Sequence, residues 1–470
     1  MHPSLSCSRR RFLKRATAAV AAPSLIPRGA PARAEQASAM RVAFFEADVT
    51  PPPGSILCHG FGTPAKEILD PLTARGIVLL GPETPIVLCA VDWVGISNAS
   101  QDAFRQALAE ATHTSPDRVS IHVVHQHNAP GMDFSTEEIL AAHGLSGKMF
   151  DVDFARQVIE RVARAAGEAA GKPRQVTHLG YGMAKVEQVA STRRVLTDEG
   201  KLKFWRSSSG GTAEMKAAPE GLIDPYVRLL SLWDGREPLA ALTYYACHPC
   251  AYYGQGDVSS EIMGVARTMR DAALPGVMNI HFNGAGGDIA VGKYNDGTPA
   301  TRPRLAKRLA AGMRAAWEAQ KKVPIAAADV DWRVEAVGLP LRKDYDEAEL
   351  LRGVANPNAS SRDRVQTARK LAWLYRVRSG YQTEIGCLRI GPACVLHMPG
   401  ELFVEYQLAA QRMRPDDFVC MAAYTDQGGP TYICTAAAYP QGGYEAGASR
   451  VAPEVEQVLL AAMRRLLDAR

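Results

Sequence analysis

The chain has 470 residues, 47% of them hydrophobic and 22% charged, which is ordinary globular composition with ample material for a core. The formal net charge is +5, but residues 1–34 hold seven Lys and Arg and no acid, so residues 35–470 carry −2. The basic charge therefore belongs mostly to residues 1–34 and does not indicate nucleic acid or a membrane as a partner. No nucleic-acid partner is expected, and no apolar run is long enough for a transmembrane helix.

The first 34 residues predict an export signal. Ser8-Arg9-Arg10-Arg11-Phe12-Leu13-Lys14 matches the twin-arginine pattern, an apolar stretch follows over Ala16–Leu25, and Ala32-Arg33-Ala34 fits a cleavage site. A disordered basic arm is the alternative interpretation. We therefore expect export to the periplasm or beyond by the twin-arginine route, which carries folded proteins and suits one that acquires a metal before export. Residues 35–470 are expected to form a single domain.

Strands and helices alternate along the rest of the chain. Hydrophobic periodicity and turn residues predict strands over Arg41–Asp48, Gly76–Leu80, Ile86–Asp92, Arg118–Val124, Val176–Val186, Tyr226–Trp233, Leu239–Cys247 and Val277–Phe282. Helices are expected over Ser97–Thr112, Asp153–Ala170, Arg302–Lys321, Arg362–Tyr375 and Pro453–Leu467. This mixture indicates the α/β class, with mixed sheets and flanking helices.

Two histidines stand where the strand Arg118–Val124 ends, in the stretch VVHQHNAPG. Residues i and i+2 of a strand point to the same face, so His125 and His127 are expected to project together. The motif fits a metal site, since histidine is the commonest metal ligand, but it also fits a merely polar strand end.

A third histidine, His248, ends the strand Leu239–Cys247 and precedes Pro249. Cys247 and Cys250 have C-x-x-C spacing, yet a structural zinc knuckle needs a second ligand pair, and no second C-x-x-C exists. Eight cysteines lie in residues 35–470, several of them in apolar runs typical of buried free thiols. Their pairing does not follow from the sequence.

The stretch NGAGGD, Asn283 to Asp288, follows the strand Val277–Phe282. The G-x-x-x-x-G-K spacing from Gly287 to Lys293 resembles a phosphate-binding loop, but Tyr294 replaces the required Ser or Thr and no helix follows. We expect a tight glycine turn beside a site, with Asp288 as an orienting carboxylate.

The last motifs are His397-Met398-Pro399-Gly400-Glu401, with Glu401 expected at the start of a helix, and the loop tyrosines Tyr432 and Tyr444. An acid in a first helical turn can simply compensate the helix dipole, and loop tyrosines can simply pack. The chain has no H-E-x-x-H, G-x-S-x-G or strand-linked G-x-G-x-x-G, which argues against zincins, serine α/β-hydrolases and dinucleotide enzymes.

Taken together, VHQHNAPG, CHP, NGAGGD, PGE and the Tyr432…Tyr444-Glu445 pair occur in the order found in the neutral/alkaline, non-lysosomal ceramidase family, which the chain resembles from about Arg41 onward. Asp48-Val49-Thr50-Pro51-Pro52-Pro53-Gly54 is similar to that family's opening signature. The chain departs from the family at Asn128-Ala129, after Gly287-Asp288, and in having no counterpart of the C-terminal β-domain.

The resemblance implies a ceramidase-like catalytic domain with one Zn²⁺ held by His125, His248, Glu401 and Tyr432. It implies that His127 and Tyr444 face the substrate carbonyl as hydrogen-bond donors, and that Arg193, with Arg194 as the alternative, contacts substrate. The implied reaction is hydrolysis of the amide bond of ceramide-like or other N-acyl compounds by a metal-activated water. The alternatives are a zinc hydrolase of another amide or ester, or an exported solute-binding protein with a degenerate metal site. The oligomeric state does not follow from the sequence.

Overall fold

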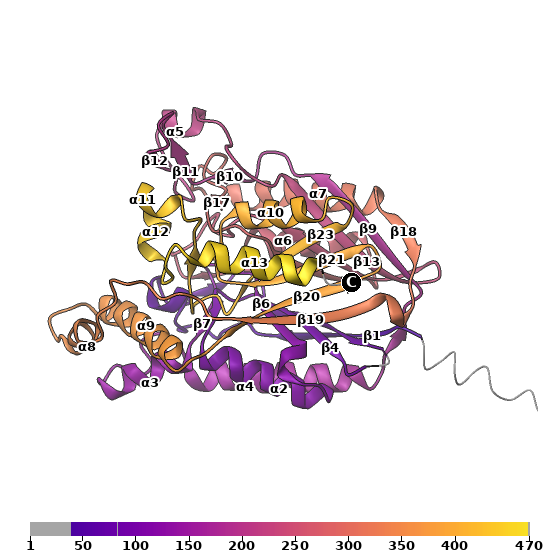
Figure 1. Cartoon of the computed structure of the whole chain (residues 1–470), viewed down its shortest axis with the longest axis horizontal. Coiled ribbons are helices and arrows are strands. Elements are labelled where there is room, and N and C mark those ends of the chain that lie inside the picture. The colour runs from indigo at the N-terminus through magenta and orange to yellow at the C-terminus, as the bar shows by residue number, and fades with distance from the viewer. Residues whose placement is uncertain (1–38, 82, 469–470) are drawn as a thin grey trace, which may run out of the picture. The chain divides into compact units, whose positions relative to one another are not determined.

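Three larger β-sheets flanked by helices, together with five two-stranded sheets, form the fold in the computed structural model, which describes residues 39–81 and 83–468 (Figure 1). The proposed signal, residues 1–34, lies outside the described residues. Residues Ser38–Arg470 cluster as one compact unit by their contacts. Among the described residues, no helix combines the length and apolar character needed to cross a membrane.

The first sheet forms from the N-terminal third of the chain. Its strand order is β6 (Val119–Val123), β4 (Ile86–Val91), β3 (Thr73–Leu80), β1 (Arg41–Asp48) and β8 (Arg174–Gln175). Strand β4 is buried at every position, as expected for a run of Ile, Val and Leu inside a sheet. Helices α2 (Ala99–Thr112) and α4 (Val152–Ala170) pack on this sheet (Figure 1). Asp151 caps α4 by accepting from the Phe154 amide at 3.0 Å.

The second sheet has the order β16 (Met278–Asn283), β14 (Glu237–Tyr245), β13 (Tyr226–Asp234), β9 (His178–Lys185) and β18 (Lys321–Pro324). Helices α6 (Glu261–Ala273) and α7 (Thr301–Glu318) pack on it. The third has the order β19 (Val330–Val337), β20 (Thr383–Ile390), β21 (Ala393–Pro399) and β23 (Phe418–Thr425), with α10 (Val404–Met413) and α13 (Val455–Asp468) beside it.

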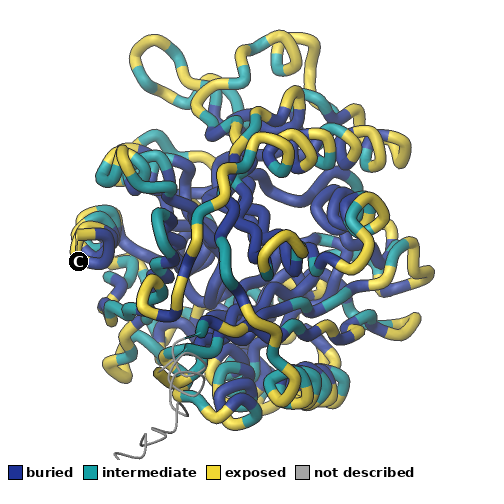
Figure 2. Tube along the Cα trace, turned by 90° about the vertical axis from the view of Figure 1, so that its right-hand side faces the viewer, coloured by how far each residue is buried: buried dark blue, intermediate teal, exposed yellow. Residues whose placement is uncertain are grey.

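Strand β23 lies against both β6 and β16, so the three sheets meet in the interior. In Figure 2 the buried parts of the chain run through the interior, while the exposed segments lie on the outside. The predicted α/β class, with mixed sheets and flanking helices, is confirmed. The predicted strand Arg41–Asp48 is β1, and the other predicted strands and helices are found with ends shifted by a few residues.

Each sheet contains one parallel strand pair: β4 with β6, β14 with β16, and β21 with β23. Loops at the carboxyl ends of parallel strands are the usual place for ligand sites in α/β proteins. The motifs of the sequence all follow the carboxyl ends of β6, β14, β16, β21 and β23. Shared strand direction therefore carries them to one region.

Candidate metal centre and active-site cleft

Three histidines from two sheets meet at the centre of this region. His125 Nε2 and His248 Nε2 lie 3.2 Å apart although 123 residues separate them in the chain. The ligand atoms of His125, His127 and His248 all lie within 4.8 Å of one another. These three residues could hold a metal ion.

The backbone orients each of the three rings in the same way. Each ring contacts a backbone carbonyl through Nδ1: His125 that of Val94 at 2.5 Å, His248 that of Gly286 at 3.1 Å, and His127 that of Pro249 at 3.2 Å. A carbonyl oxygen can only accept a hydrogen bond, so Nδ1 must carry the proton in each ring. Nε2 is then left with its lone pair in a neutral ring. A hydrogen bond from Nδ1 to a backbone carbonyl is the usual arrangement of a histidine that binds a metal through Nε2.

Burial also keeps the rings of His127 and His248 neutral. It lowers the pKa of His127 to about 3, with His125 adding to the effect. It lowers the pKa of His248 well below the ordinary histidine value, again with His125 as the second cause. A neutral imidazole is the form that binds metals.

The position of His125 corrects one expectation. Strand β6 ends at Val123, so His125 and His127 are not on one face of a strand. His125 has a φ of 71°, a left-handed conformation that is uncommon for a residue with a side chain. Its ring lies 4.7 Å from that of His127 because of this irregular backbone. Strain of this kind concentrates at functional sites.

Glu401 adds a carboxylate to the cluster. Its Oε2 lies 3.5 Å from His125 Nε2 and 3.6 Å from His248 Nε2, and this buried oxygen has no hydrogen-bond partner among the described residues. Its Oε1 accepts from Gln427 Nε2 at 2.6 Å. Burial favours the protonated form of Glu401, but His125, His127 and the hydrogen bond from Gln427 together outweigh it, and the pKa of Glu401 is lowered. The carboxylate is therefore ionised at neutral pH.

The expected helical position of Glu401 is wrong. Glu401 belongs to the short strand β22 (Glu401–Leu402), which pairs in parallel with β24 (Tyr432–Ile433), and helix α10 begins only at Val404. The register sets Glu401 directly beside Tyr432. A strand pair thus brings these two residues together, and the helix-dipole explanation does not apply.

Tyr432 is held by Arg193. Arg193 Nη1 donates to the Tyr432 hydroxyl at 3.0 Å, and Arg193 Nε lies 3.3 Å from Glu445 Oε1. Burial raises the pKa of Tyr432 well above the ordinary tyrosine value, against the opposing effect of Arg193. Arg193 lines the cleft described below, whereas Arg194 is turned to Glu445 (3.1 Å) and the Gly442 carbonyl (2.8 Å).

Tyr444 stands at the start of α12 (Tyr444–Ala448) and is 54% exposed. Its ring lies 5.6 Å from that of Tyr432 and 5.4 Å from that of Trp205. Among the described residues no hydrogen bond is formed by its hydroxyl, so that group is available to a substrate.

The glycine turn supports the site through its backbone. Asp288 Oδ1 accepts from the Val404 amide at 2.9 Å, just after Glu401, and its carbonyl accepts from the Arg193 amide at 2.7 Å. Asp288 thus fixes the segments that carry Glu401 and Arg193. Asn283 is fully buried, and its backbone N–H donates to His122 Nε2 at 2.9 Å.

Sequence reasoning missed His59 and Gln427. The His59 ring is buried against the paired strands β5 (Gly95–Ile96) and β7 (Gly131–Met132), where the neighbouring glycines Gly95 and Gly131 leave it room. A histidine between Cys58 and Gly60 in a loop gives only a weak sequence signal. Gln427 lies in a glycine-rich turn and reaches Glu401 only in the folded chain.

The cluster opens into a cleft of about 820 Å³, lined among others by His125, His127, Arg193, His248, Glu401, Tyr432 and Tyr444. A cleft of this size suits a small organic ligand. The eight described cysteines, Cys247 and Cys250 included, are buried free thiols.

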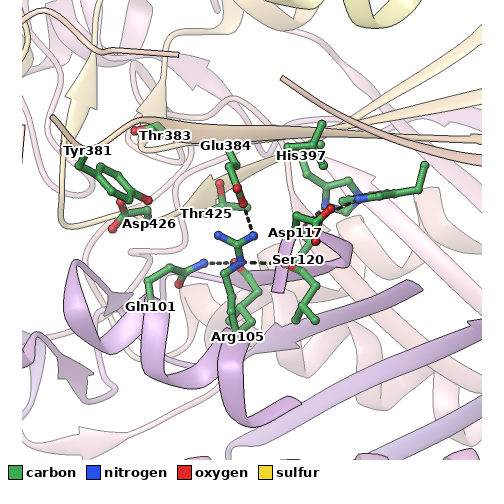
Figure 3. Close-up of a pocket in the computed structure, with 15 residues that line it drawn as sticks. Gln101, Arg105, Asp117, Ser120, Tyr381, Thr383, Glu384, His397, Thr425 and Asp426 are labelled. Atoms are coloured by element: carbon green, nitrogen blue, oxygen red, sulfur yellow. Dashed lines mark hydrogen bonds and ion pairs between the residues drawn. The ribbon is translucent and has the colours of Figure 1, made fainter. Parts of the chain in front are cut away.

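A second pocket lies apart from this cleft, between α2, β6 and the third sheet (Figure 3). It encloses about 30 Å³, room for one or two water molecules. Some of its polar groups pair with each other: Arg105 pairs with Glu384, and Ser120 Oγ lies 2.8 Å from His397 Nδ1. Gln101 Oε1, His397 Nε2 and Asp426 Oδ2 are buried without a hydrogen-bond partner among the described residues. This pocket is a polar packing contact between two sheets.

No protein-family model and no curated protein matches the chain. A solved structure described as a ceramidase complexed with C2 is similar to 91% of this chain, with a TM-score of 0.66 and 14% sequence identity, and the match covers 75% of that structure's chain. The crystal structure of the neutral ceramidase from Pseudomonas aeruginosa also matches 91% of this chain, with a TM-score of 0.67 and 15% identity, over 74% of its own chain. At such low identity the likeness shows the fold alone. The chain has a ceramidase-like α/β fold.

Proposed function

We propose that the chain is a zinc-dependent hydrolase that cleaves the amide bond of N-acyl compounds. The main support is the spacing of three possible ligand atoms. His125 Nε2 lies 3.2 Å from His248 Nε2, and Glu401 Oε2 lies 3.5 Å from the first and 3.6 Å from the second. Two ligands of one tetrahedral zinc, each at ~2.0–2.1 Å from the ion, lie about 3.3 Å apart. The partnerless Oε2 of Glu401 fits the same requirement.

Tyr432 would be the fourth zinc ligand, as the family resemblance implies. Its hydroxyl accepts from Arg193, which favours the phenolate form that a metal needs. When bound, zinc supplies a Lewis acid that polarises a carbonyl oxygen and makes water nucleophilic near neutral pH.

The remaining residues would handle protons and charge. His127 donates from Nδ1 to the Pro249 carbonyl, and its pKa of about 3 keeps the ring neutral, so its Nε2 would accept a hydrogen bond from the attacking water and orient it. The proton that the leaving amine needs would come from that water. This differs from the donor role that the resemblance implies. Tyr444 has a free hydroxyl to donate to the oxyanion that forms on the substrate carbonyl, and Arg193 adds positive charge.

Two solved neighbours of the same fold are ceramidases, which supports an N-acyl substrate. A zinc hydrolase of esters is the second enzymatic candidate, since the same groups would attack an ester. A solute-binding protein with an inactive centre is the non-enzymatic one. Export by the twin-arginine route remains part of the proposal.

Metal analysis and a substrate panel test the proposal. Purified protein should contain about one zinc per chain, and His248→Ala should lose it. Fluorogenic N-acyl amides and esters should be hydrolysed, and chelation should abolish turnover. Full zinc retention by His248→Ala would contradict the ligand assignment. Absent or chelator-insensitive turnover across the panel would favour the solute-binding protein.

A further inference from the structure

The cleft beside the histidine cluster is strongly cationic. Its lining includes five cationic side chains and a single carboxylate, that of Glu401. The cations are Arg193, Arg362, Arg369, Lys370 and Arg450. Residues 35–470 carry a net charge of −2, so this positive charge is a local feature of the cleft and not a property of the whole surface.

Arg369 is the most unusual of these cations. Its exposed fraction is 5%, and among the described residues it forms no ion pair and no hydrogen bond; its Nε is fully buried without a partner. Burial lowers the pKa of its guanidinium. A buried cation without a partner is costly, and native proteins rarely retain one without a use.

Nearby acids do not neutralise Arg369. The carboxylate with the largest effect on it, Asp133, caps helix α3 (Phe134–Ala142) and is occupied. Asp133 Oδ2 accepts from Asn98 Nδ2 and from Thr136 Oγ1, both at 2.7 Å. Glu401, the other nearby acid, belongs to the proposed zinc centre.

Three of the five cations, Arg362, Arg369 and Lys370, lie on one face of helix α9 (Ser361–Arg378). Arg362, Gln366, Arg369 and Lys370 follow the i, i+4, i+7, i+8 spacing that lines up on a single helical face, and all four line the cleft. Phe61 packs under the two arginines, with the guanidinium carbons of Arg362 and Arg369 at 4.9 and 5.9 Å from its ring centroid. This contact holds them in place without using their N–H donors.

The other two arginines of the cleft are engaged. Arg193 is paired with Glu445. Arg450 is buried and donates to the Gly428 and Gly429 carbonyls at 2.5 and 3.1 Å, contacts that do not cancel its charge. The free donors of the cleft therefore belong to α9.

We infer that the substrate carries an anionic group, such as a carboxylate or a phosphate, which binds Arg369 with help from Arg362 and Lys370 while its amide lies at the histidine cluster. A guanidinium presents paired N–H donors that match either anion. This inference rests on the proposed hydrolase function and gives it a substrate class: N-acyl compounds whose amine portion is acidic, in place of an uncharged N-acyl lipid.

Three amides with the same acyl chain test the inference. N-lauroylglycine is anionic, N-lauroylglycinamide is its uncharged counterpart, and N-lauroyl-O-phosphoethanolamine replaces the carboxylate by a phosphate. We expect kcat/KM for at least one anionic amide to exceed that for the uncharged amide about 10- to 100-fold, the range for hydrogen bonds to a charged group. The better of the two anionic amides identifies the anion.

The ratio of anionic to uncharged kcat/KM should collapse to a few-fold in Arg369→Met and fall less in Arg362→Gln and Lys370→Gln, which alter exposed side chains. Arg378→Gln is the matched control: it lies on the same helix, is exposed, and pairs with Glu347 outside the cleft. Its ratio should equal that of the wild type.

Hydrolysis of all three amides at equal rates, unaffected by Arg369→Met, would overturn the anion site and leave the hydrolase standing. If none is hydrolysed, the proposed function fails, and calorimetric titration of N-lauroylglycine and its phosphate analogue then decides the anion site alone. The anion site is supported if the affinity for N-lauroylglycine or for its phosphate analogue falls at least 10-fold in Arg369→Met and does not fall in Arg378→Gln. The anion site is refuted if neither compound binds the wild type, or if the two variants bind them equally.

Discussion

A single added methyl group at Gly131 should disturb the packing behind the candidate site. A Cβ on Gly131 would lie 2.2 Å from His59 Cε1 and 2.7 Å from its Nδ1, far inside van der Waals contact. The His59 ring is buried and also lies against Gly95, the strand partner of Gly131, so it cannot swing away freely. Gly131 does not have a left-handed φ, so alanine brings only the clash. Overpacking of this kind costs about 1–3 kcal/mol of unfolding free energy.

A double-mutant cycle in urea measures this effect. Gly131→Ala should lose about 1–3 kcal/mol in the wild-type background and nearly nothing beside His59→Ala, because the smaller side chain removes the clash. Gly338→Ala, where an added Cβ meets nothing within 4 Å, is the control and should change stability little. An equal loss from Gly131→Ala in both backgrounds would refute the contact between Gly131 and His59.

The other predictions concern the site tyrosines and three buried ionisable residues. Tyr444→Phe should keep its zinc and lose about 10²–10³-fold in kcat, since it removes one oxyanion donor, whereas Tyr432→Phe should bind zinc more weakly. Zinc content and kcat of the two variants are measured in parallel. If neither variant changes in zinc content or in kcat, the two tyrosines are packing residues. Burial raises the pKa of Asp426 from 3.8 to about 7, so the folded state binds the extra proton and wild-type stability falls as pH rises from ~4 to 7. Asp426→Asn should therefore gain stability over the wild type at pH 8, by at most about 4 kcal/mol, and not at pH 4; equal differences at both pH values would contradict this. Arg267 donates from Nη1 and Nη2 to the buried Asp92 carboxylate at 2.9 and 2.5 Å. Arg267→Met leaves that carboxylate without its cation, and it should lower the free energy of unfolding, measured in urea, by about 3–5 kcal/mol. Arg369→Met strands nothing and should not destabilise, and a comparable loss there would mean that Arg369 has a structural partner.

Local sequence pattern was sufficient for most of the fold. Alternating and continuous apolar runs predicted β1 with its bounds and most other strands and helices within a few residues, because period and turn residues act over short distances. The order of the motifs also pointed to a ceramidase-like fold. His125, His248 and Glu401 were selected by their motifs, and the folded chain brings them together.

Local pattern misled where backbone geometry was irregular. The expected strand at His125 gives way to a left-handed residue, and the expected helix at Glu401 gives way to a strand paired with Tyr432. Neither change follows from neighbours in sequence. Both depend on hydrogen bonds to segments far along the chain, such as that between the Glu401 amide and the Thr431 carbonyl at 2.7 Å.

Only the tertiary structure brought His59, Gln427 and Arg369 to the site. In sequence, Arg369 is one of several charges on an ordinary surface-type helix, and Gln427 is one polar residue in a turn. Their significance depends on which groups lie across the cleft and on whether water still reaches them. These neighbours depend on how the whole chain packs, because burial and pairing are properties of contacts between segments that are distant in sequence, from 26 residues for Gln427 and Glu401 to about 300 for Arg369 and Phe61.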